Sequence, residues 1–486
     1  MEKLVKVEYL IERGNIKKGT ICNCPIKDAK FLVELGHAKI LDVLEMETNK
    51  TLTFEERKIL ENNAGSNKKL IDTLNKEFLD EQDINYCRTF LNKINDAPIN
   101  SKYLKILQDP KLFNNITEIE LDKKIVKEIE TRKCIFLCSQ GRLVENCQIA
   151  SYNLLVNDEA GAGKDYITSK TLEMNPEENY IKKTRISPTV FTYWHNSQYE
   201  PEWSWDGKIF YTEDISENVL NSEVFKVMCS SGSQATIVIR QRAIDINIKG
   251  KPVIITTTAN SIPNPELTRR FEIVCLDESI DQTKEIMKRH SEYAVKGISP
   301  EYNQDYIEAL GFLKRVKVKI PYAESLTKIF PATSIMMRTK FPRFLDLIRA
   351  STAFHQYQRV KDEEGFLLAT KQDYEIASEV MKKLISNKYL ISLTKKQKKI
   401  IDFFESISQV NPNFNESSTR IREQMCNFIS LPAMITNLSI LSGYGLLNVH
   451  IEEQSNGKEV EKYELSEHIK KGGDFVIFPD FDYLIS

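Results

Sequence analysis

Residues 151–170, SYNLLVNDEAGAGKDYITSK, contain the stretch that decides the fold. An apolar run leads into a loop of small residues, and the loop ends in Gly163-Lys164, where a helical pattern begins. Glycines let backbone N–H groups turn toward a phosphate, the helix N-terminus adds partial positive charge, and a lysine reaches the β and γ oxygens. The stretch therefore predicts a strand, a phosphate-binding loop (P-loop) and a helix. The candidate nucleotide-binding residues are Gly161, Ala162, Gly163, Lys164 and Asp165.

The loop departs from the usual G-x-x-x-x-G-K-[ST] pattern at two positions. Asp158 stands where the pattern has its first glycine, and Asp165 stands where it has the serine or threonine that binds Mg²⁺. Because Mg²⁺ accepts carboxylate oxygens, Asp165 remains a candidate metal ligand. Taken alone, a loop with these two changes fits an ordinary strand, turn and helix as well as it fits a nucleotide-binding loop.

A second apolar run, KIFYTED at 208–214, ends in two acidic residues. An ATP-hydrolysing site needs acids beside the P-loop to hold the metal and to activate water. We predict that Glu213 holds the metal or its water shell and that Asp214 polarises the attacking water. The alternative is an acidic strand end that faces solvent.

Two further segments complete the candidate ATPase site. The β-branched run PVIITTTANS, at 252–261, closes on Asn260, whose amide is placed to align an attacking water near the γ-phosphate. Arg270 follows in a basic pair before the next apolar run, and it is a candidate arginine finger for the γ-phosphate of a neighbouring subunit. The order of these segments predicts an enzyme that hydrolyses ATP and uses Mg²⁺.

The order of apolar and helical runs sets the expected domains. From residue 131, short apolar runs alternate with helical segments, which predicts an α/β core, a parallel sheet with flanking helices. The run CIFLC at 134–138 is expected to be one of its strands. The expected domains are a small α/β unit at 1–48, a helical collar or linker at 49–130, the core at 131–280, a helical lid at 281–395 and a winged-helix domain at 396–486.

Length and composition bound the remaining possibilities. A chain of 486 residues is too long for one hydrophobic core and has room for about three domains. It has no apolar run of about 18 residues, as a membrane span needs, and its amino terminus lacks a secretory signal, so we expect a cytoplasmic protein without a membrane partner. Its nine cysteines show no zinc-ligand spacing. A net charge of −2 excludes a uniformly basic nucleic-acid coat, but not DNA binding by a few loops.

Residues 130–395 resemble the AAA+ replicative helicases, and within them the minichromosome-maintenance (MCM) helicases and the MCM-like or primase-associated helicases of archaeal mobile elements and viruses. Arg270 and the phenylalanine after it are similar to the Ser-Arg-Phe motif of the MCM arginine finger. Residues 341–349, FPRFLDLIR, resemble the lid pattern that carries a second ATP-sensing arginine, which implies that Arg343 contacts nucleotide. The P-loop aspartates and the Glu-Asp order depart from the family pattern.

The resemblance also implies a DNA-contacting hairpin before the strand that ends in Asn260. MCM helicases place a lysine 18 residues before that asparagine. Arg242 occupies this position, and Arg240 lies two residues earlier on the same expected hairpin face. A positive hairpin that projects into a ring channel can grip the phosphate backbone of DNA. A solvated basic hairpin is the alternative.

Together these implications favour an ATP-dependent DNA helicase or translocase that acts in DNA replication. Because an arginine finger works between neighbours, the resemblance implies a homo-oligomeric ring, expected to be a hexamer. Its expected partners are single-stranded or forked DNA and a primase or other replication protein. Two alternatives stay open: an AAA+ loader or remodeller that never unwinds DNA, and a non-catalytic DNA-binding scaffold with a degenerate P-loop.

Overall fold

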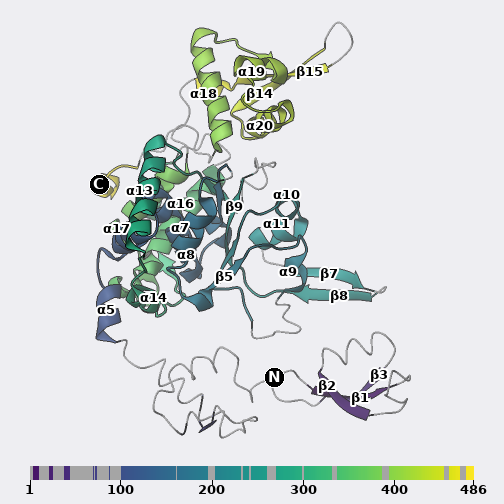
Figure 1. Cartoon of the computed structure of the whole chain (residues 1–486), viewed down its shortest axis with the longest axis vertical. Helices are drawn as coiled ribbons and strands as arrows, with labels where there is room; N and C mark the ends of the chain where they lie inside the picture. Colours follow the sequence, from purple (N-terminus) through teal and green to yellow (C-terminus); the bar gives the residue numbers. More distant parts are fainter. Residues whose placement is uncertain are drawn as a thin grey trace. The chain divides into compact units, whose positions relative to one another are not determined.

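The computed structural model of the chain divides into two compact units, Met1–Ile99 and Asn100–Ser486. Figure 1 shows the helices and strands of each unit. In the first unit the structure describes residues 4–9, 21–25, 38–43, 69, 72, 73 and 87. In the second it describes 100–485 except 160, 195–202, 231–233, 240–241, 260–269, 298–299, 331–336, 386–392, 454–458 and 471–477.

The first unit contains a three-stranded antiparallel sheet in the order β2-β1-β3. The central strand pairs on both sides, since Val5 lies opposite Cys24 of β2 and opposite Val43 of β3. Strands therefore occur in the predicted small unit at 1–48, whereas its helical part lies outside the described residues. The strands are β1 (Leu4–Tyr9), β2 (Ile21–Pro25) and β3 (Ala38–Val43).

A five-stranded parallel sheet in the order β10-β4-β9-β6-β5 forms the centre of the second unit. Every residue of β4, β6, β9 and β10 is buried, as expected for a parallel sheet that helices cover on both faces. The predicted α/β fold with a parallel sheet is therefore confirmed. The strands are β4 (Leu154–Asn157), β5 (Tyr180–Lys183), β6 (Ile209–Thr212), β9 (Val253–Thr258) and β10 (Glu272–Val274).

Alternate residues of each strand enter two different hydrophobic clusters, one on each face of the sheet. Leu154 and Val156 belong to the larger cluster, with side chains of α7, α16 and α17. Leu155 belongs to the smaller cluster, with side chains of α9, α10 and α11. Figure 1 shows these two groups of helices on either side of the sheet. The helices are α7 (Ile129–Gln140), α9 (Val190–Tyr193), α10 (Glu217–Leu220), α11 (Glu223–Ser230), α16 (Met337–Phe354) and α17 (Lys371–Leu384).

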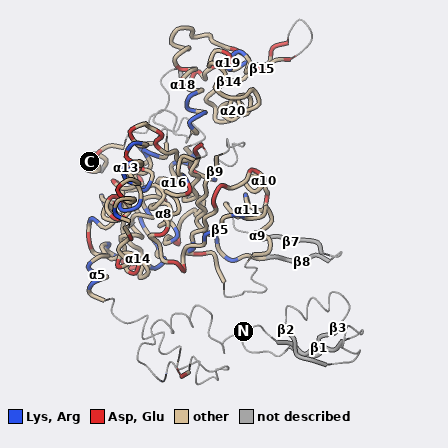
Figure 2. The backbone as a smooth tube through the Cα atoms, in the orientation of Figure 1, with Lys and Arg blue, Asp and Glu red and all other residues tan. Residues whose placement is uncertain are grey.

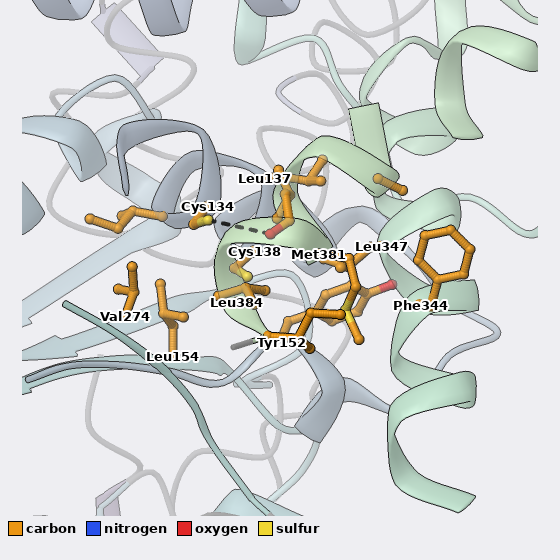
Figure 3. Close-up of a cluster of buried hydrophobic side chains, with 14 of the residues drawn as sticks. Cys134, Leu137, Cys138, Tyr152, Leu154, Val274, Phe344, Leu347, Met381 and Leu384 are labelled. Atoms are coloured by element: carbon orange, nitrogen blue, oxygen red, sulfur yellow. Dashed lines mark hydrogen bonds between the residues drawn. The ribbon is translucent and has the colours of Figure 1, made fainter. Parts of the chain in front are cut away.

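Helix α7 stands where the sequence predicts a strand. The run CIFLC at 134–138 lies in the middle of this helix, and every residue from Thr131 to Gln140 is buried. Helices α16 and α17 pack against α7, as does the following helix, α8 (Lys164–Leu172). Figure 3 shows Cys134 and Cys138 of α7 among side chains of the sheet, of α16 and of α17. The strand prediction was wrong because a short apolar run does not distinguish a buried strand from a buried helix.

The described end of the predicted helical collar, residues 100–128, is largely helical. Leu112, Phe113 and Ile116 join the larger hydrophobic cluster, so this segment packs on the core of the second unit. Its elements are α5 (Ser101–Leu107), α6 (Leu112–Asn114), a π-helical turn at Asn115–Glu120 and a 3₁₀ turn at Leu121–Lys123.

The predicted hairpin between the acidic strand and β9 is present. Strands β7 (Gln234–Ile239) and β8 (Arg242–Asn247) pair antiparallel, with Ile239 opposite Arg242, and they take no part in the parallel sheet. The two residues between the strands, which include Arg240, lie outside the described residues.

The segment predicted as a helical lid, 281–395, is mainly helical in its described part. Two of its long helices, α16 and α17, pack on α7, and Phe344, Leu347 and Met381 share the larger hydrophobic cluster with β4. These two helices therefore belong to the same core as the sheet. The segment also contains α13 (Ile280–Lys296), α14 (Gln304–Leu310) and α15 (Ala323–Leu326).

From Lys395 the chain forms helices followed by antiparallel strands. β14 pairs with β15 from Leu447 opposite Leu465 to Glu453 opposite Glu459, and β13 adds a third strand. Its elements are α18 (Lys395–Val410), β13 (Glu416–Ser417), α19 (Ser418–Gln424), α20 (Leu431–Gly443), β14 (Leu447–Glu453), β15 (Glu459–Leu465), α21 (Glu467–Lys470) and α22 (Phe481–Ile485). Within the described part of the chain, no helix has both the length and the apolar character of a membrane span.

Candidate nucleotide-binding site

The loop from β4 to α8 has the backbone that a phosphate-binding loop needs. Gly161 and Gly163 adopt φ angles of 90° and 86°, in the left-handed region that glycine enters without strain. Helix α8 begins directly after them at Lys164, whose side chain is buried. Backbone N–H groups and the positive end of the helix therefore meet at the lysine, which suits an anion such as a nucleotide phosphate.

Three strand ends meet at this loop. In the sheet, β9 lies between β4 and β6, so the segments that follow these strands leave the same edge. β4 leads into the P-loop, β6 leads into Glu213 and Asp214, and β9 leads into Ala259. The structure thus brings the predicted P-loop and the predicted acidic pair together. Ligands of open parallel sheets bind at this carboxyl edge.

Thr257 of β9 connects the first turn of α8 with the acidic pair. Its hydroxyl donates to the Asp165 carboxylate and accepts the Asp214 backbone N–H at 2.7 Å. Tyr211 of β6 also donates to the Asp165 carboxylate, at 3.5 Å. Burial, reinforced by the charges of Asp165 and Glu213, raises the pKa of Tyr211, so its hydroxyl keeps the proton that it donates. Sequence reasoning missed Thr257, although a threonine run inside a buried strand was a usable signal.

The two acids after β6 have different partners. Glu213 forms an ion pair with Lys182 of β5 at 2.6 Å, and Lys182 also donates to Ser169 of α8 at 3.0 Å. Asp214 adopts a left-handed φ of 37°, and its carboxylate accepts the Ala259 N–H at 3.3 Å. A non-glycine residue in this conformation is strained, and such strain is typically found at functional sites.

The acids of this edge line one cavity of about 830 Å³, which includes Asp165, Glu213 and Asp214. Among the residues that the structure describes, no three carboxylates, histidines or cysteines are grouped closely enough to hold a metal ion by themselves. Mg²⁺ does not require such a group, because it takes one or two carboxylates together with waters and substrate phosphates. The carboxylate oxygens of the cavity fit Mg²⁺ in that form.

Asp158, at the first position of the loop, is held by hydrogen bonds and an ion pair. Its carboxylate accepts the Leu276 N–H and the Glu159 N–H, both at 2.9 Å, and contacts Lys395 at 3.0 Å. Burial acts to raise the pKa of Asp158, but hydrogen bonds from Glu278, Lys395 and the two backbone N–H groups outweigh it, so the pKa is lowered. Asp158 is therefore a carboxylate at neutral pH.

Four residues predicted from the sequence lie elsewhere or are described only in part or not at all. Arg270 precedes β10, and its Nε donates to the Ser230 hydroxyl at 2.7 Å. Asn260 and Arg240 lie outside the described residues, and of Arg242 only the backbone position in β8 is described.

Arg343 does not lie at the nucleotide site. It forms an ion pair with Glu272 of β10, to which Lys340 also binds at 2.6 Å. Glu272 is paired in register with Leu154, the first residue of β4, so this cluster lies at the amino edge of the sheet, opposite the P-loop. Only 2% of the Arg343 side chain is exposed, which also keeps it from a neighbouring subunit. In this structure Arg343 therefore binds within the fold, away from the P-loop of its own subunit, and not at the position that the resemblance implies.

Comparison with known proteins supports the nucleotide-binding reading of this edge. Residues 99–316 match the family described as the MTBMA_p00010 P-loop domain. The match includes the loop from β4 to α8, the acidic pair and β9. No curated protein matches the chain. The second unit thus contains a P-loop domain built on a parallel five-stranded sheet.

Proposed function

We propose that the chain is an AAA+ ATPase that acts as a DNA helicase or translocase in DNA replication. The observation that carries the proposal is the carboxyl edge of the sheet, where the P-loop, the acidic pair and the end of β9 meet. Because β9 lies between β4 and β6, its end at Thr258 and Ala259 lies beside both other strand ends. A sensor residue such as Asn260 needs this position to contact the γ-phosphate.

The residues of the edge divide the work of ATP hydrolysis. Lys164 and the backbone N–H groups of the loop bind the β and γ phosphates. Asp165 and Glu213 are the residues that would hold Mg²⁺ or its water shell, and the bound metal would neutralise charge on the phosphates. Asp214 orients and polarises the attacking water, since its backbone and carboxylate are fixed by Thr257 and Ala259.

Arg270 is proposed to act between subunits. Because it lies two residues before β10, it is at the amino edge of its own sheet, opposite its own P-loop. It is only partly buried, unlike Arg343. An arginine in this position can reach a γ-phosphate only in a neighbouring subunit, which supports the proposed homo-oligomeric ring, a hexamer.

Two features support DNA as the partner. The hairpin of β7 and β8 projects from the chain between β6 and β9, and Arg242 begins its second strand, with Arg240 between the strands. The part of the chain from Lys395 has the helices followed by paired strands that a winged-helix domain requires. A loader or remodeller without unwinding activity, and a non-catalytic scaffold, share these features and are separated from the helicase by experiment.

The first test is ATP hydrolysis by the purified chain, with and without single-stranded DNA. We expect turnover that DNA stimulates, and a loss of at least about a hundredfold in Lys164→Ala, because the lysine neutralises phosphate charge in the transition state. Lys170→Ala is the matched control, since Lys170 lies in the same helix and pairs with Glu173. Absence of turnover in the wild type would favour the scaffold.

The second test separates a helicase from a loader. Strand displacement on a forked DNA duplex is expected to require ATP and Lys164. DNA-stimulated hydrolysis without displacement on any fork polarity would assign the chain to the loaders or remodellers.

A further inference from the structure

A carboxylate occupies the first position of the P-loop, where the loop is built to receive phosphates. Asp158 is held there from inside the fold, by the N–H of Leu276, two residues after β10, and by the Glu159 N–H, and only 1% of its side chain is exposed. A negative charge in this place repels nucleotide phosphates, and low water content strengthens the repulsion. The site therefore needs a positive charge close to Asp158.

Lys395, the first residue of α18, supplies that charge. Its Nζ lies 3.0 Å and 3.2 Å from the two carboxylate oxygens of Asp158 and 3.0 Å from Glu278. Burial acts to lower the pKa of Lys395, but its hydrogen bonds and charge interactions with Asp158 and Glu278 raise it overall, so the lysine stays protonated. The hydroxyl of Thr394 caps the helix by accepting the Gln397 N–H, which fixes the start of α18 and with it the lysine.

The contact forms one wall of a cavity of about 290 Å³ beside the P-loop. Asp158, Glu159 and Ala259 line it from the sheet, and Lys396 and Lys399 line it from α18. Figure 2 shows the lysines at the start of α18. The first half of the loop is thus covered by the amino-terminal end of α18, which carries positive partial charge and three lysine side chains.

We propose that Lys395 is a positioning residue of the nucleotide site, which neutralises Asp158 so that a P-loop with an aspartate in place of its first glycine can accept phosphates. The inference rests on the proposed nucleotide binding. It also means that the carboxyl-terminal helices and strands are linked to nucleotide affinity through the contact of Lys395 with Asp158, so that moving α18 away from the loop weakens ATP binding and, reciprocally, ATP holds α18 in place.

The test is a double-mutant cycle on nucleotide affinity, measured with a fluorescent N-methylanthraniloyl derivative of ATP and Mg²⁺. We expect Lys395→Ala to weaken binding by at least about tenfold, because it leaves Asp158 uncompensated. Asp158→Asn removes the charge that needs compensation, so adding Lys395→Ala to it is expected to change affinity by less than about threefold. Lys395→Arg keeps the charge and is expected to retain binding.

Lys398→Ala is the matched control, because Lys398 is exposed on the same helix. Thermal unfolding of each variant shows whether it is folded. If Lys395→Ala weakens nucleotide binding equally in the wild type and in Asp158→Asn, Lys395 only docks α18 and the inference is overturned. Unchanged affinity in Lys395→Ala would overturn it as well. A wild-type chain that binds no nucleotide would instead overturn the proposed function on which the inference rests.

Discussion

The two edges of the parallel sheet hold charged side chains in opposite ways. At the carboxyl edge, the carboxylates of Asp165 and Asp214 line an open cavity, where the Thr257 hydroxyl donates to Asp165 and the Ala259 N–H donates to Asp214. At the amino edge, Glu272 binds Lys340 and Arg343, and each of the three side chains is at most 3% exposed. Charges that line a cavity stay available to a ligand, whereas charges that close on one another are neutralised within the fold. The comparison supports the proposed nucleotide site of the subunit at the carboxyl edge and gives the buried cluster around Glu272, at the amino edge, a role in stability.

The largest expected effect is on catalysis at the carboxyl edge. Asp214→Asn removes the group that polarises water, so the rate of ATP hydrolysis is expected to fall by about 10²- to 10⁴-fold. ATP affinity and the unfolding temperature are expected to change little, because Asp214 is exposed. Steady-state hydrolysis and equilibrium binding measure the two effects, with Glu217→Gln, an exposed acid of α10, as control. Undiminished turnover in Asp214→Asn would transfer the role to another group, and Glu213 would be the first to test.

A large effect on stability is expected at the amino edge. Glu272→Gln leaves Lys340 and Arg343 buried without a counter-charge, which is expected to cost about 3–5 kcal/mol of unfolding free energy. Chemical denaturation measures the loss, and nucleotide affinity of the folded protein should stay unchanged. Burial already lowers the pKa of Lys340. In the variant, Lys340 binds a proton more weakly in the folded state than in the unfolded one, so the deficit should shrink as the pH rises toward the ordinary pKa of lysine.

A loss of ATP affinity in folded Glu272→Gln would break the comparison, because it would connect the amino edge to the nucleotide. Arg343→Met removes the arginine that was predicted to sense ATP. Its expected phenotype is reduced stability with normal nucleotide binding.

The smallest effect is expected for the hydroxyl that connects the groups of the carboxyl edge. Thr257→Val leaves the Asp214 N–H without its acceptor and removes a donor to Asp165, at an expected cost of about 1–3 kcal/mol in stability and a measurable loss of turnover. Thr256→Val is a matched control, since Thr256 is equally buried and donates to the Thr212 carbonyl instead. Both variants should lose stability, but only Thr257→Val should lose ATP hydrolysis. Equal activities would show that the position of Asp214 does not depend on Thr257.

Sequence patterns were sufficient to predict those parts of the candidate site whose geometry depends on residues adjacent in the chain. The loop from Gly161 to Lys164 encodes its own geometry, and the acids at Glu213 and Asp214 follow a strand whose direction fixes the edge at which they lie. The parallel order of strands then brings the two segments together, so much of the candidate site followed from local signals.

Long-range partners set the limit of sequence prediction. Residues 341–349 predict a helix correctly, but the role of Arg343 depends on Glu272, 71 positions earlier in the chain. Lys395 lies 237 positions from Asp158. Nothing in either local sequence identifies these partners, because ion pairs across a fold depend on packing and leave no periodic pattern. The prediction of a strand at 134–138 was wrong for a related reason, since only the neighbours of this run in space determine whether it forms a strand or a helix.

Helix α7 is enclosed by elements that precede it and elements that follow it in the chain, and this determines how the polypeptide can be divided. The P-loop family covers residues 99–316, yet α16 and α17, which cover α7, begin only at Met337. A fragment cut at the end of the family match would expose Cys134, Leu137 and their neighbours to water. During synthesis, about 200 further residues must likewise be added after α7 before the helices that pack on it are complete, which takes some 10 to 40 seconds at ordinary ribosomal rates. The unit that recurs as a sequence family and the unit that can fold alone are therefore different stretches of this chain.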